Sequence, residues 1–472
     1  MANPATTLHP FQLEGVKHLK GRSACLFDEP GLGKTVMSIY ANVDASDTGP
    51  VLVITPLRNK IFFAASILHW TEVYDLAEAR TQSPANEPVV VVAETAGRFD
   101  VQEFHDAVKL RRRTWLITHW AALHEQSAQE LANVVWSSVI VDEAHRMRNR
   151  DTKQTAFVQY VLRAQHFHFL TATPQDKHPG ELWPMLYRCD PVKFRSYWKF
   201  FGEFVETKNM RFGSQSIATP VGVKNPKALA RVLKPLVLQR RKADVAPQLP
   251  PVRTTTVDIN LNGLTDTYEK LERQSYIEAQ REGAGPLYIS NQLARIIRLQ
   301  QLTSLPALIG FQEVSPKREW LQDFIEGVPL GCPVLVFTKY RETARHLALN
   351  LPHATSVVGG DTFNGWPKSV STLCVTYGTL SEGVNLDRTT DGRVVSYVVF
   401  YDLQYSHIVN EQSIHRVHRI TTNLPVNVYQ LCAVRASGKH TVDHDILDAL
   451  DHKAGDSGLV QSFLRRIQDE TR

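Results

Sequence analysis

The sequence predicts an α/β protein of two lobes, and three observations lead to this prediction. Short β-rich runs alternate with helical stretches over roughly the first 180 residues, as is typical of a parallel sheet covered by helices. A second series of β-rich runs begins near residue 334. Between the two series, the proline-dense segment 247–251 is of a kind that stops helices and stiffens a linker. We therefore expect domains at 1–246 and 247–472.

In the first lobe, the strands are expected where apolar and β-branched residues cluster in short runs. These runs are Ala24–Phe27, Val51–Ile54, Val89–Val92, Thr114–Thr118, Ser138–Val141 and Phe167–Thr171. From about Glu181 to Val237 the β-rich runs stop and aromatic residues recur in a helical setting. We expect a helical insertion over about residues 181–240, with its aromatic residues in the core.

In the second lobe, Val257, Ile259 and Leu261 alternate with polar residues, which predicts a half-buried strand. A helical region is expected over about residues 262–325. The later strands are expected at Val334–Phe337, Thr372–Thr376, Val398–Tyr401 and Val428–Leu431. Each lobe thus combines strands with attached helices.

Composition narrows the class of protein. The chain has 472 residues, of which 43% are hydrophobic and 21% charged, as in soluble globular proteins. No apolar run approaches the ~18 residues of a membrane span and the chain does not open on a signal peptide, so we expect no membrane association. We expect a cytoplasmic location, including the nucleoid, or a nuclear one in a eukaryote. The five cysteines are scattered, which favours neither disulfides nor a zinc site.

The segment Asp28-Glu29-Pro30-Gly31-Leu32-Gly33-Lys34-Thr35 carries the clearest chemical signal. It follows a short apolar run and leads into residues spaced as one helix face, so it is a strand, a glycine turn and a helix start. Such a turn surrounds a polyphosphate with backbone N–H groups. Lys34 would reach the β- and γ-phosphates of that polyphosphate, and Thr35 would ligate Mg²⁺. Asp28 occupies the position of the first glycine in the general pattern.

An acidic pair supports this interpretation. Asp142 and Glu143 follow the buried run 139–141, and parallel sheets bind ligands at such strand ends. Asp142 would position Mg²⁺, and Glu143 would activate the attacking water. Two adjacent acids alone are usually a solvated surface pair, so the combination with the phosphate-binding segment carries the argument.

Together these residues resemble the Swi/Snf-like ATPases of helicase superfamily two, nearly from end to end. The motifs that carry the resemblance are Leu8–Val16, Asp28–Thr35, Ile54–Leu57, Thr118 with Trp120, Asp142–Asn149, Leu170–Pro174, Arg240–Val245, Val334–Thr338, Ser381–Leu386 and Gln412–Arg419. The resemblance implies two RecA-like parallel-sheet lobes, with ATP and Mg²⁺ between them. It also accounts for Asp28, and it implies that Gln12 reads adenine. Ser406-His407 and Thr421-Thr422 depart from the family's usual residues.

Gln412, Arg416 and Arg419 are spaced i, i+4, i+7, which predicts one helix face with both guanidinium groups side by side. Two arginines on a helix are ordinarily surface residues. Given the resemblance, we expect them to stabilise charge on the transferring phosphoryl group, an effect of ~10³ to 10⁵ in rate.

The resemblance implies DNA, in duplex form, as the partner. The net charge of +5 says little by itself about partners. The expected nucleic-acid contacts are Thr55, Pro56, Arg58, Thr118, Thr338 and Ser381. We therefore expect an ATP-dependent DNA translocase that depends on a partner protein or a DNA structure to select its site. The alternatives are a strand-separating or annealing helicase, and a nucleotide-gated DNA-binding switch without turnover.

Overall fold

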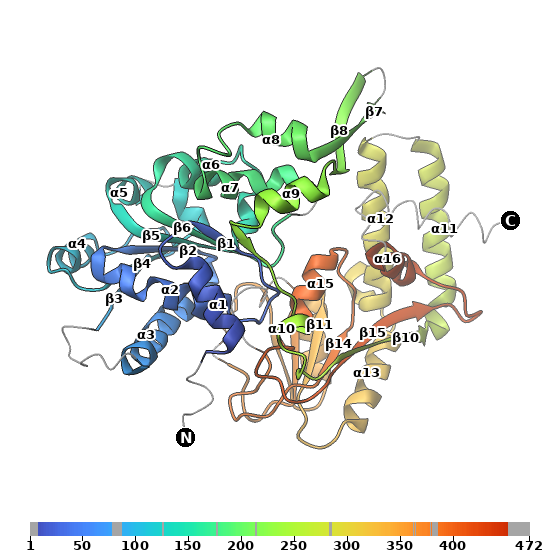
Figure 1. The fold of residues 1–472 in the computed structure, drawn as a ribbon. Coiled ribbons are helices and arrows are strands. Elements are labelled where there is room, and N and C mark those ends of the chain that lie inside the picture. The colour runs from blue at the N-terminus through green and yellow to red at the C-terminus, as the bar shows by residue number, and fades with distance from the viewer. Residues whose placement is uncertain are drawn as a thin grey trace. The chain divides into compact units, whose positions relative to one another are not determined.

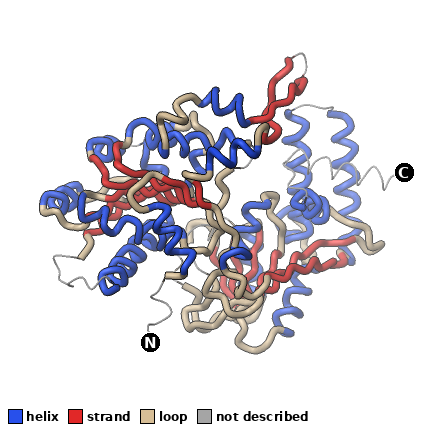
Figure 2. Tube along the Cα trace, in the orientation of Figure 1, coloured by secondary structure: helices blue, strands red, loops and turns tan. Residues whose placement is uncertain are grey.

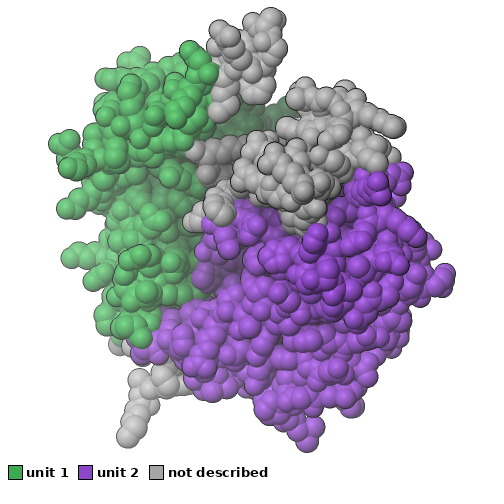
Figure 3. All heavy atoms as spheres, turned by 90° about the vertical axis from the view of Figure 1, so that its right-hand side faces the viewer, with its two compact units in different colours: residues 1–247 green, residues 248–472 purple. Residues whose placement is uncertain are grey.

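The structure is a computed structural model that describes residues 8–77, 87–124, 127–175, 178–212, 215–282, 286–361, 363, 365–377, 379 and 386–451. The chain divides into two compact units, residues 1–247 and 248–472, coloured separately in Figure 3. Each unit is a mixed α/β structure built around a parallel sheet, as the sequence predicts. Among the described residues, no helix has both the length and the apolar character that crossing a membrane requires.

The first unit contains a seven-stranded parallel sheet in the order β3-β4-β2-β5-β6-β1-β9 (Figures 1 and 2). Its strands are β1 (Ala24–Leu26), β2 (Val51–Thr55), β3 (Val89–Val92), β4 (Thr114–His119), β5 (Val135–Asp142), β6 (Arg163–Leu170) and β9 (Val237–Leu238). Strands β1, β2 and β4 are buried along their whole length, because helices cover both faces of a parallel sheet.

Alternate side chains of this sheet enter two different cores. Val51, Val53 and Ile140 pack with helices α1, α2 and α3, whereas Leu52, Ile54 and Val141 pack into the core that includes α4, α5 and α7. The first set of helices is α1 (Pro10–Leu19), α2 (Lys34–Thr48) and α3 (Lys60–Ala77). On the other face are α4 (Val101–Lys109), α5 (Ser127–Asn133), α6 (Lys153–Ala156) and α7 (Trp183–Cys189).

The insertion is not wholly helical, contrary to expectation. After α8 (Tyr197–Phe204), strands β7 (Val205–Phe212) and β8 (Gln215–Val223) form an antiparallel hairpin, and α9 (Pro226–Leu233) follows. The hairpin forms a separate two-stranded sheet, so its strands do not need the buried apolar run that marks a central strand of a parallel sheet. The sequence pattern therefore did not reveal it. Of the aromatic residues expected in the core, Trp183, Phe194 and Phe204 are buried there, whereas Trp198 is exposed, contrary to expectation.

The second unit contains a six-stranded parallel sheet in the order β10-β15-β14-β11-β13-β12. The strands are β10 (Val252–Asn260), β11 (Val334–Thr338), β12 (Ala354–Val357), β13 (Thr372–Thr376), β14 (Tyr397–Phe400) and β15 (Val426–Val434). Strand β12 was not predicted; it is an edge strand whose first three residues are only half-buried. The strand has only four residues, of mixed composition, which explains why no strand was predicted there.

The helices of the second unit surround this sheet. They are α11 (Thr265–Glu282), α12 (Pro286–Ser304), α13 (Pro316–Gly327), α14 (Arg341–Asn350), α15 (His407–Ile414) and α16 (Val442–Asp451), while α10 (Lys242–Val245) belongs to the end of the first unit. Helices α11, α12 and α13 occupy the region expected to be helical. One large core joins α11, α12 and α16 to strands β11, β13, β14 and β15.

Candidate nucleotide-binding site

The register of the first sheet places the predicted motifs at one edge. Leu26 at the end of β1 lies level with Leu170 of β6, which lies level with Asp142 of β5. On the next strand, Ile54 lies level with Val141 and with Thr118. Because all these strands are parallel, the residues that follow their carboxyl ends share the edge where such sheets bind ligands.

The phosphate-binding loop, residues 28–35, has the backbone shape that its glycines predict. Gly31 and Gly33 have φ values of 84° and 87°, which other residues rarely adopt. A Cβ atom on Gly33 would lie 2.4 Å from Gln12 Nε2, so a larger residue would also force the Gln12 amide to move. Lys34 begins α2, and its Nζ donates to the carbonyl oxygens of Asp28 at 2.6 Å and Glu29 at 3.3 Å. The ammonium group therefore lies against the loop that is expected to hold phosphate.

Gln12 joins helix α1 to this loop. Its buried side chain accepts a hydrogen bond from His9 N at 2.9 Å and donates one to Leu32 O at 3.1 Å. The residue expected to read adenine is thus fixed directly beside the phosphate-binding loop.

Asp28 forms a contact that the sequence did not reveal. Its fully buried carboxylate pairs with Arg240, whose Nε lies 3.1 Å from Oδ1 and whose other nitrogen lies 2.6 Å from Oδ2. Strand β9 pairs with β1 and so delivers Arg240 to the loop. The two residues are 212 positions apart, so no local pattern could indicate the pair.

The acidic pair lies where predicted. Thr55 Oγ1 donates to Asp142 Oδ2 at 2.7 Å, and Trp120 Nε1 donates to the Asp142 carbonyl at 3.1 Å. The carboxylate is half-buried and is oriented by its threonine neighbour. Glu143 has φ 49° and ψ 50°, a left-handed conformation that costs on the order of 1 kcal/mol outside glycine. Such strain is concentrated at functional sites.

His145 connects Glu143 to the next motif. Its Nδ1 lies 3.1 Å from Glu143 Oε2 and 3.3 Å from Thr171 Oγ1. Thr171 in turn accepts a hydrogen bond from Thr173 N at 3.2 Å, and Arg148 donates to the Thr173 carbonyl. A chain of polar contacts thus runs from the predicted water-activating residue to the end of β6.

The expected nucleic-acid contacts of this unit differ in exposure. Thr55, Pro56 and Thr118 are buried, and the Thr55 hydroxyl is directed to Asp142. Arg58 alone among the four has an exposed side chain. Their contact with DNA stays a prediction, and in this structure Thr55 serves to orient Asp142.

Arg416 and Arg419 do not share a helix face, contrary to expectation. Helix α15 ends at Ile414, so Gln412 lies inside it, Arg416 lies in the turn that follows, and Arg419 lies beyond that turn. Their i, i+3 spacing is compatible with a turn as well as with a helix, so it could not reveal this end. Burial lowers the pKa of the Arg419 guanidinium to about 10, assisted by the positive charge of Arg416. Both side chains are half-buried, and Arg419 remains charged at neutral pH.

Thr338, the expected nucleic-acid contact of the second unit, is fully buried at the end of β11. Its hydroxyl donates to Asp402 Oδ2, which also accepts from Ser304 Oγ at 3.0 Å and from Lys339 N at 3.2 Å. Burial raises the pKa of the Asp402 carboxyl, although Lys317 opposes this shift. Ser381 lies outside the described residues.

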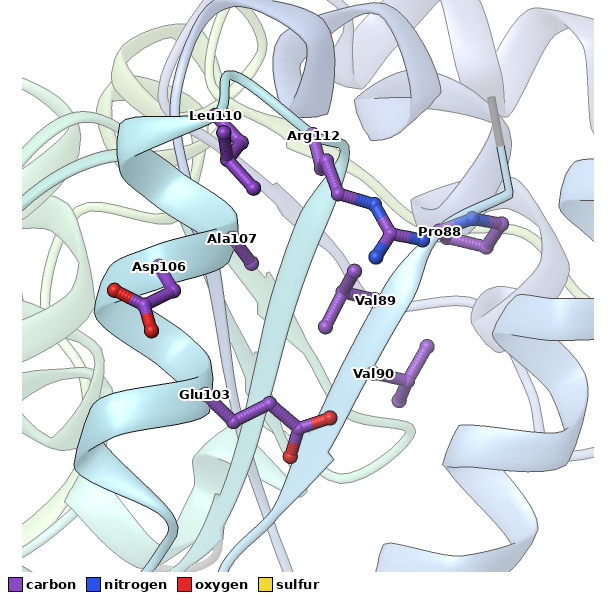
Figure 4. A pocket seen from close by; sticks show the side chains of 8 residues that line it. All are labelled: Pro88, Val89, Val90, Glu103, Asp106, Ala107, Leu110 and Arg112. Carbon is purple, nitrogen blue, oxygen red and sulfur yellow. The ribbon is translucent and has the colours of Figure 1, made fainter. Parts of the chain in front are cut away.

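Two hollows lie elsewhere in the units. One of about 470 Å³ lies between β3 and α4, where Figure 4 shows Glu103 of the helix reaching toward the strand. The other, of about 450 Å³, includes Val334 and Thr372, the first residues of β11 and β13. Both lie at the amino ends of strands, whereas the predicted chemistry lies at the carboxyl ends. Neither is the nucleotide site.

The fold and the motifs at this sheet edge are those of the Swi/Snf-like ATPases of helicase superfamily two. The family described as SNF2-related domain matches residues 11–308, and the chain belongs to that family. It is 29% identical over 322 residues to human chromodomain-helicase-DNA-binding protein 7, covering 65% of this chain and 10% of that protein. It is 24% identical to the CHD3-type chromatin-remodeling factor PICKLE of Arabidopsis thaliana, covering 90% of this chain and 32% of the relative.

Among solved structures, the Hef helicase domain of Pyrococcus furiosus is similar, with a TM-score of 0.55 and 15% identity. The similarity covers 94% of this chain and 98% of that one. At this identity the comparison supports the two-lobed helicase fold. The chain spans about a tenth of the length of the first of these curated relatives and about a third of the second.

Proposed function

We propose that this chain uses ATP hydrolysis to move along duplex DNA. The observation that carries the proposal is the meeting of the phosphate-binding loop with the Thr55–Asp142 contact and Glu143 at one sheet edge. Membership in the SNF2-related family supports DNA as the partner, as do the DNA-binding proteins among its relatives.

The residues at this edge fit ATP with Mg²⁺. The two glycines have the left-handed conformation typical of turns whose N–H groups bind phosphate, and the Lys34 ammonium group donates to two carbonyl oxygens that a phosphate oxygen can replace. Thr35 and Asp142 would hold the metal, and bound Mg²⁺ neutralises charge on the β- and γ-phosphates. Among the described residues no cluster of three His, Cys, Asp or Glu side chains could hold a metal ion.

In the proposed reaction, Glu143 takes a proton from the attacking water, and His145 holds its carboxylate in place through the 3.1 Å contact. Lys34 balances the charge that develops on the phosphates. Arg416 and Arg419 of the second unit are proposed to stabilise the transferring phosphoryl group.

The test compares ATP hydrolysis without nucleic acid and with single-stranded DNA, duplex DNA or RNA. We expect the largest stimulation by duplex DNA. A DNA strand annealed as a third strand in the major groove should then be displaced only with ATP, while the duplex stays paired. If duplex DNA stimulated ATP hydrolysis but the third strand were not displaced in either orientation on the duplex, the proposed ATPase activity would stand and movement along DNA would be refuted. Separation of a forked duplex would instead favour the strand-separating helicase.

A further inference from the structure

The phosphate-binding loop carries an ion pair where the general pattern has a glycine. Asp28 is fully buried, and an isolated buried carboxylate is costly unless it is paired and hydrogen-bonded. Arg240 meets that requirement with two parallel contacts, at 3.1 Å to Oδ1 and 2.6 Å to Oδ2. Paired, planar contacts of this kind fix geometry as well as charge. The position of the Asp28 carboxylate is therefore fixed by Arg240.

The same guanidinium group also holds helix α1. One of its nitrogens donates to the carbonyl of Phe11 and lies 3.5 Å from Glu14 Oε2, and its carbon lies 5.3 Å from the centre of the Phe11 ring. Phe11 is adjacent to Gln12, whose side chain donates to Leu32 O. Arg240 thus contacts both elements expected to bind ATP, the helix with Gln12 and the loop.

Backbone groups of residues 240 and 242 also bind the loop, through Glu29. Glu29 N donates to the Arg240 carbonyl at 3.0 Å, and Lys242 N donates to Glu29 Oε2 at 2.8 Å. Both acidic residues at the start of the loop are therefore engaged by residues 240–242. A loop with two glycines in left-handed conformations has wide conformational freedom, and these contacts restrict it.

We infer that Arg240 is a positioning residue that keeps the phosphate-binding loop in the shape that accepts ATP. This inference rests on the proposed ATP binding. If the loop has the ATP-binding shape in only a fraction of the molecules, the apparent dissociation constant for ATP equals the intrinsic one divided by that fraction. Once ATP is bound, its phosphates order the loop themselves. Loss of Arg240 therefore weakens ATP binding more than it slows turnover at saturation.

The structure supplies a matched control in the first unit. Arg113 and Asp75 form another buried, two-contact pair, at 2.7 Å and 3.0 Å, with side chains of similar burial. Arg113 precedes β4, at the sheet edge opposite the loop. Loss of this pair is expected to destabilise the fold without affecting ATP binding.

The experiment uses the full chain with Arg240→Ala, Arg240→Lys and Arg113→Ala. A fluorescent ATP analogue measures nucleotide affinity without DNA, and steady-state hydrolysis with saturating duplex DNA gives KM and kcat. We expect Arg240→Ala to weaken binding about tenfold with a smaller fall in kcat, and Arg240→Lys to recover part of the loss. Arg113→Ala should lower the melting temperature but leave affinity within about twofold of the parent chain.

Three results separate the possibilities. Unchanged affinity in a folded Arg240→Lys or Arg240→Ala chain would overturn the positioning role. Equal weakening by Arg113→Ala would also overturn it, because general destabilisation would then explain the loss. If the parent chain itself bound no ATP analogue, the proposed function would fail instead.

A double-mutant cycle tests whether the pair acts as a unit. Asp28→Gly restores the general glycine pattern, and Arg240→Ala removes its partner. If each loosens the loop by breaking the same contact, the double variant should bind ATP about as weakly as the weaker single variant. Losses that multiply would show that Asp28 and Arg240 act separately, and would contradict the inference.

Discussion

Each unit has a threonine–aspartate hydrogen bond at the carboxyl edge of its sheet, but the two aspartates differ in exposure. In the first, Thr55 ends β2 and donates to Asp142 at the end of the adjacent β5. In the second, Thr338 ends β11 and donates to Asp402, which follows the adjacent β14. Asp142 is half-buried, whereas Asp402 is fully buried and accepts two further hydrogen bonds.

We propose that the two carboxylates differ in role because they differ in exposure. Asp142 is partly exposed at the carboxyl edge of the first sheet, where we propose that ATP binds with Mg²⁺. Asp402 accepts hydrogen bonds from three protein donors through Oδ2, and burial raises its pKa, which is the environment of a group that stabilises the fold. The comparison teaches that the same threonine–aspartate contact between parallel strands occurs at a half-exposed carboxylate, which we propose takes part in catalysis, and at a fully buried one.

The largest expected effect concerns Asp142. Asp142→Ala should lower kcat for ATP hydrolysis at least about a hundredfold, because the group proposed to position Mg²⁺ is lost. The thermal midpoint should change little, since the side chain is half-buried. Steady-state hydrolysis and a melting curve measure the two quantities. Glu143→Gln is the companion variant, in which ATP binding should persist while turnover is lost.

A second prediction concerns the arginines of the second unit. Arg416→Ala should lower kcat by about two orders of magnitude with little change in ATP affinity, because such a group acts mainly in the transition state. Arg388→Ala is the control, since Arg388 is an exposed arginine of the same unit. A normal kcat for the Arg416 variant would show that hydrolysis does not use this side chain.

Asp402 provides the reverse of the Asp142 result. Asp402→Ala leaves Ser304, Thr338 and the Lys339 N–H without their buried acceptor, which should lower the unfolding free energy by about 3 kcal/mol. Denaturant unfolding measures this loss, with Asp142→Ala beside it. Equal destabilisation by both variants would remove the distinction between the two carboxylates.

The parts of this arrangement that the sequence predicts are those whose chemistry is local. The glycine turn, the acidic pair and most strands of both sheets depend on neighbouring residues, and the structure places them as expected. The Asp28–Arg240 and Thr338–Asp402 contacts join distant segments, so only the folded sheets bring them together. The hairpin β7–β8 and the edge strand β12 lack a buried apolar run, and a spacing pattern alone could not locate the end of α15.

The smallest expected effect concerns Lys339, which follows Thr338 in the buried network. Its Nζ lies 3.4 Å from the centre of the Tyr405 ring and 3.1 Å from Gln300 Oε1, and burial lowers its pKa to about 8, against an opposing effect of Asp402. A lysine with a lowered pKa in the folded state contributes stability above its unfolded pKa, near 10.5, and loses it as pH falls through about 8.

The unfolding free energy of the parent chain should therefore rise between pH 8 and pH 10.5 relative to Lys339→Met, by about 1 kcal/mol after allowance for solvent screening. Below pH 8 the difference between the two chains should be constant. Denaturant unfolding at several pH values measures it, and subtracting the two chains cancels the other groups that titrate in this range. A difference that stays flat up to pH 10.5 would show that Lys339 has its ordinary pKa. The ammonium group would then be solvated, and the edge of the second sheet would be more open than that of a purely structural network.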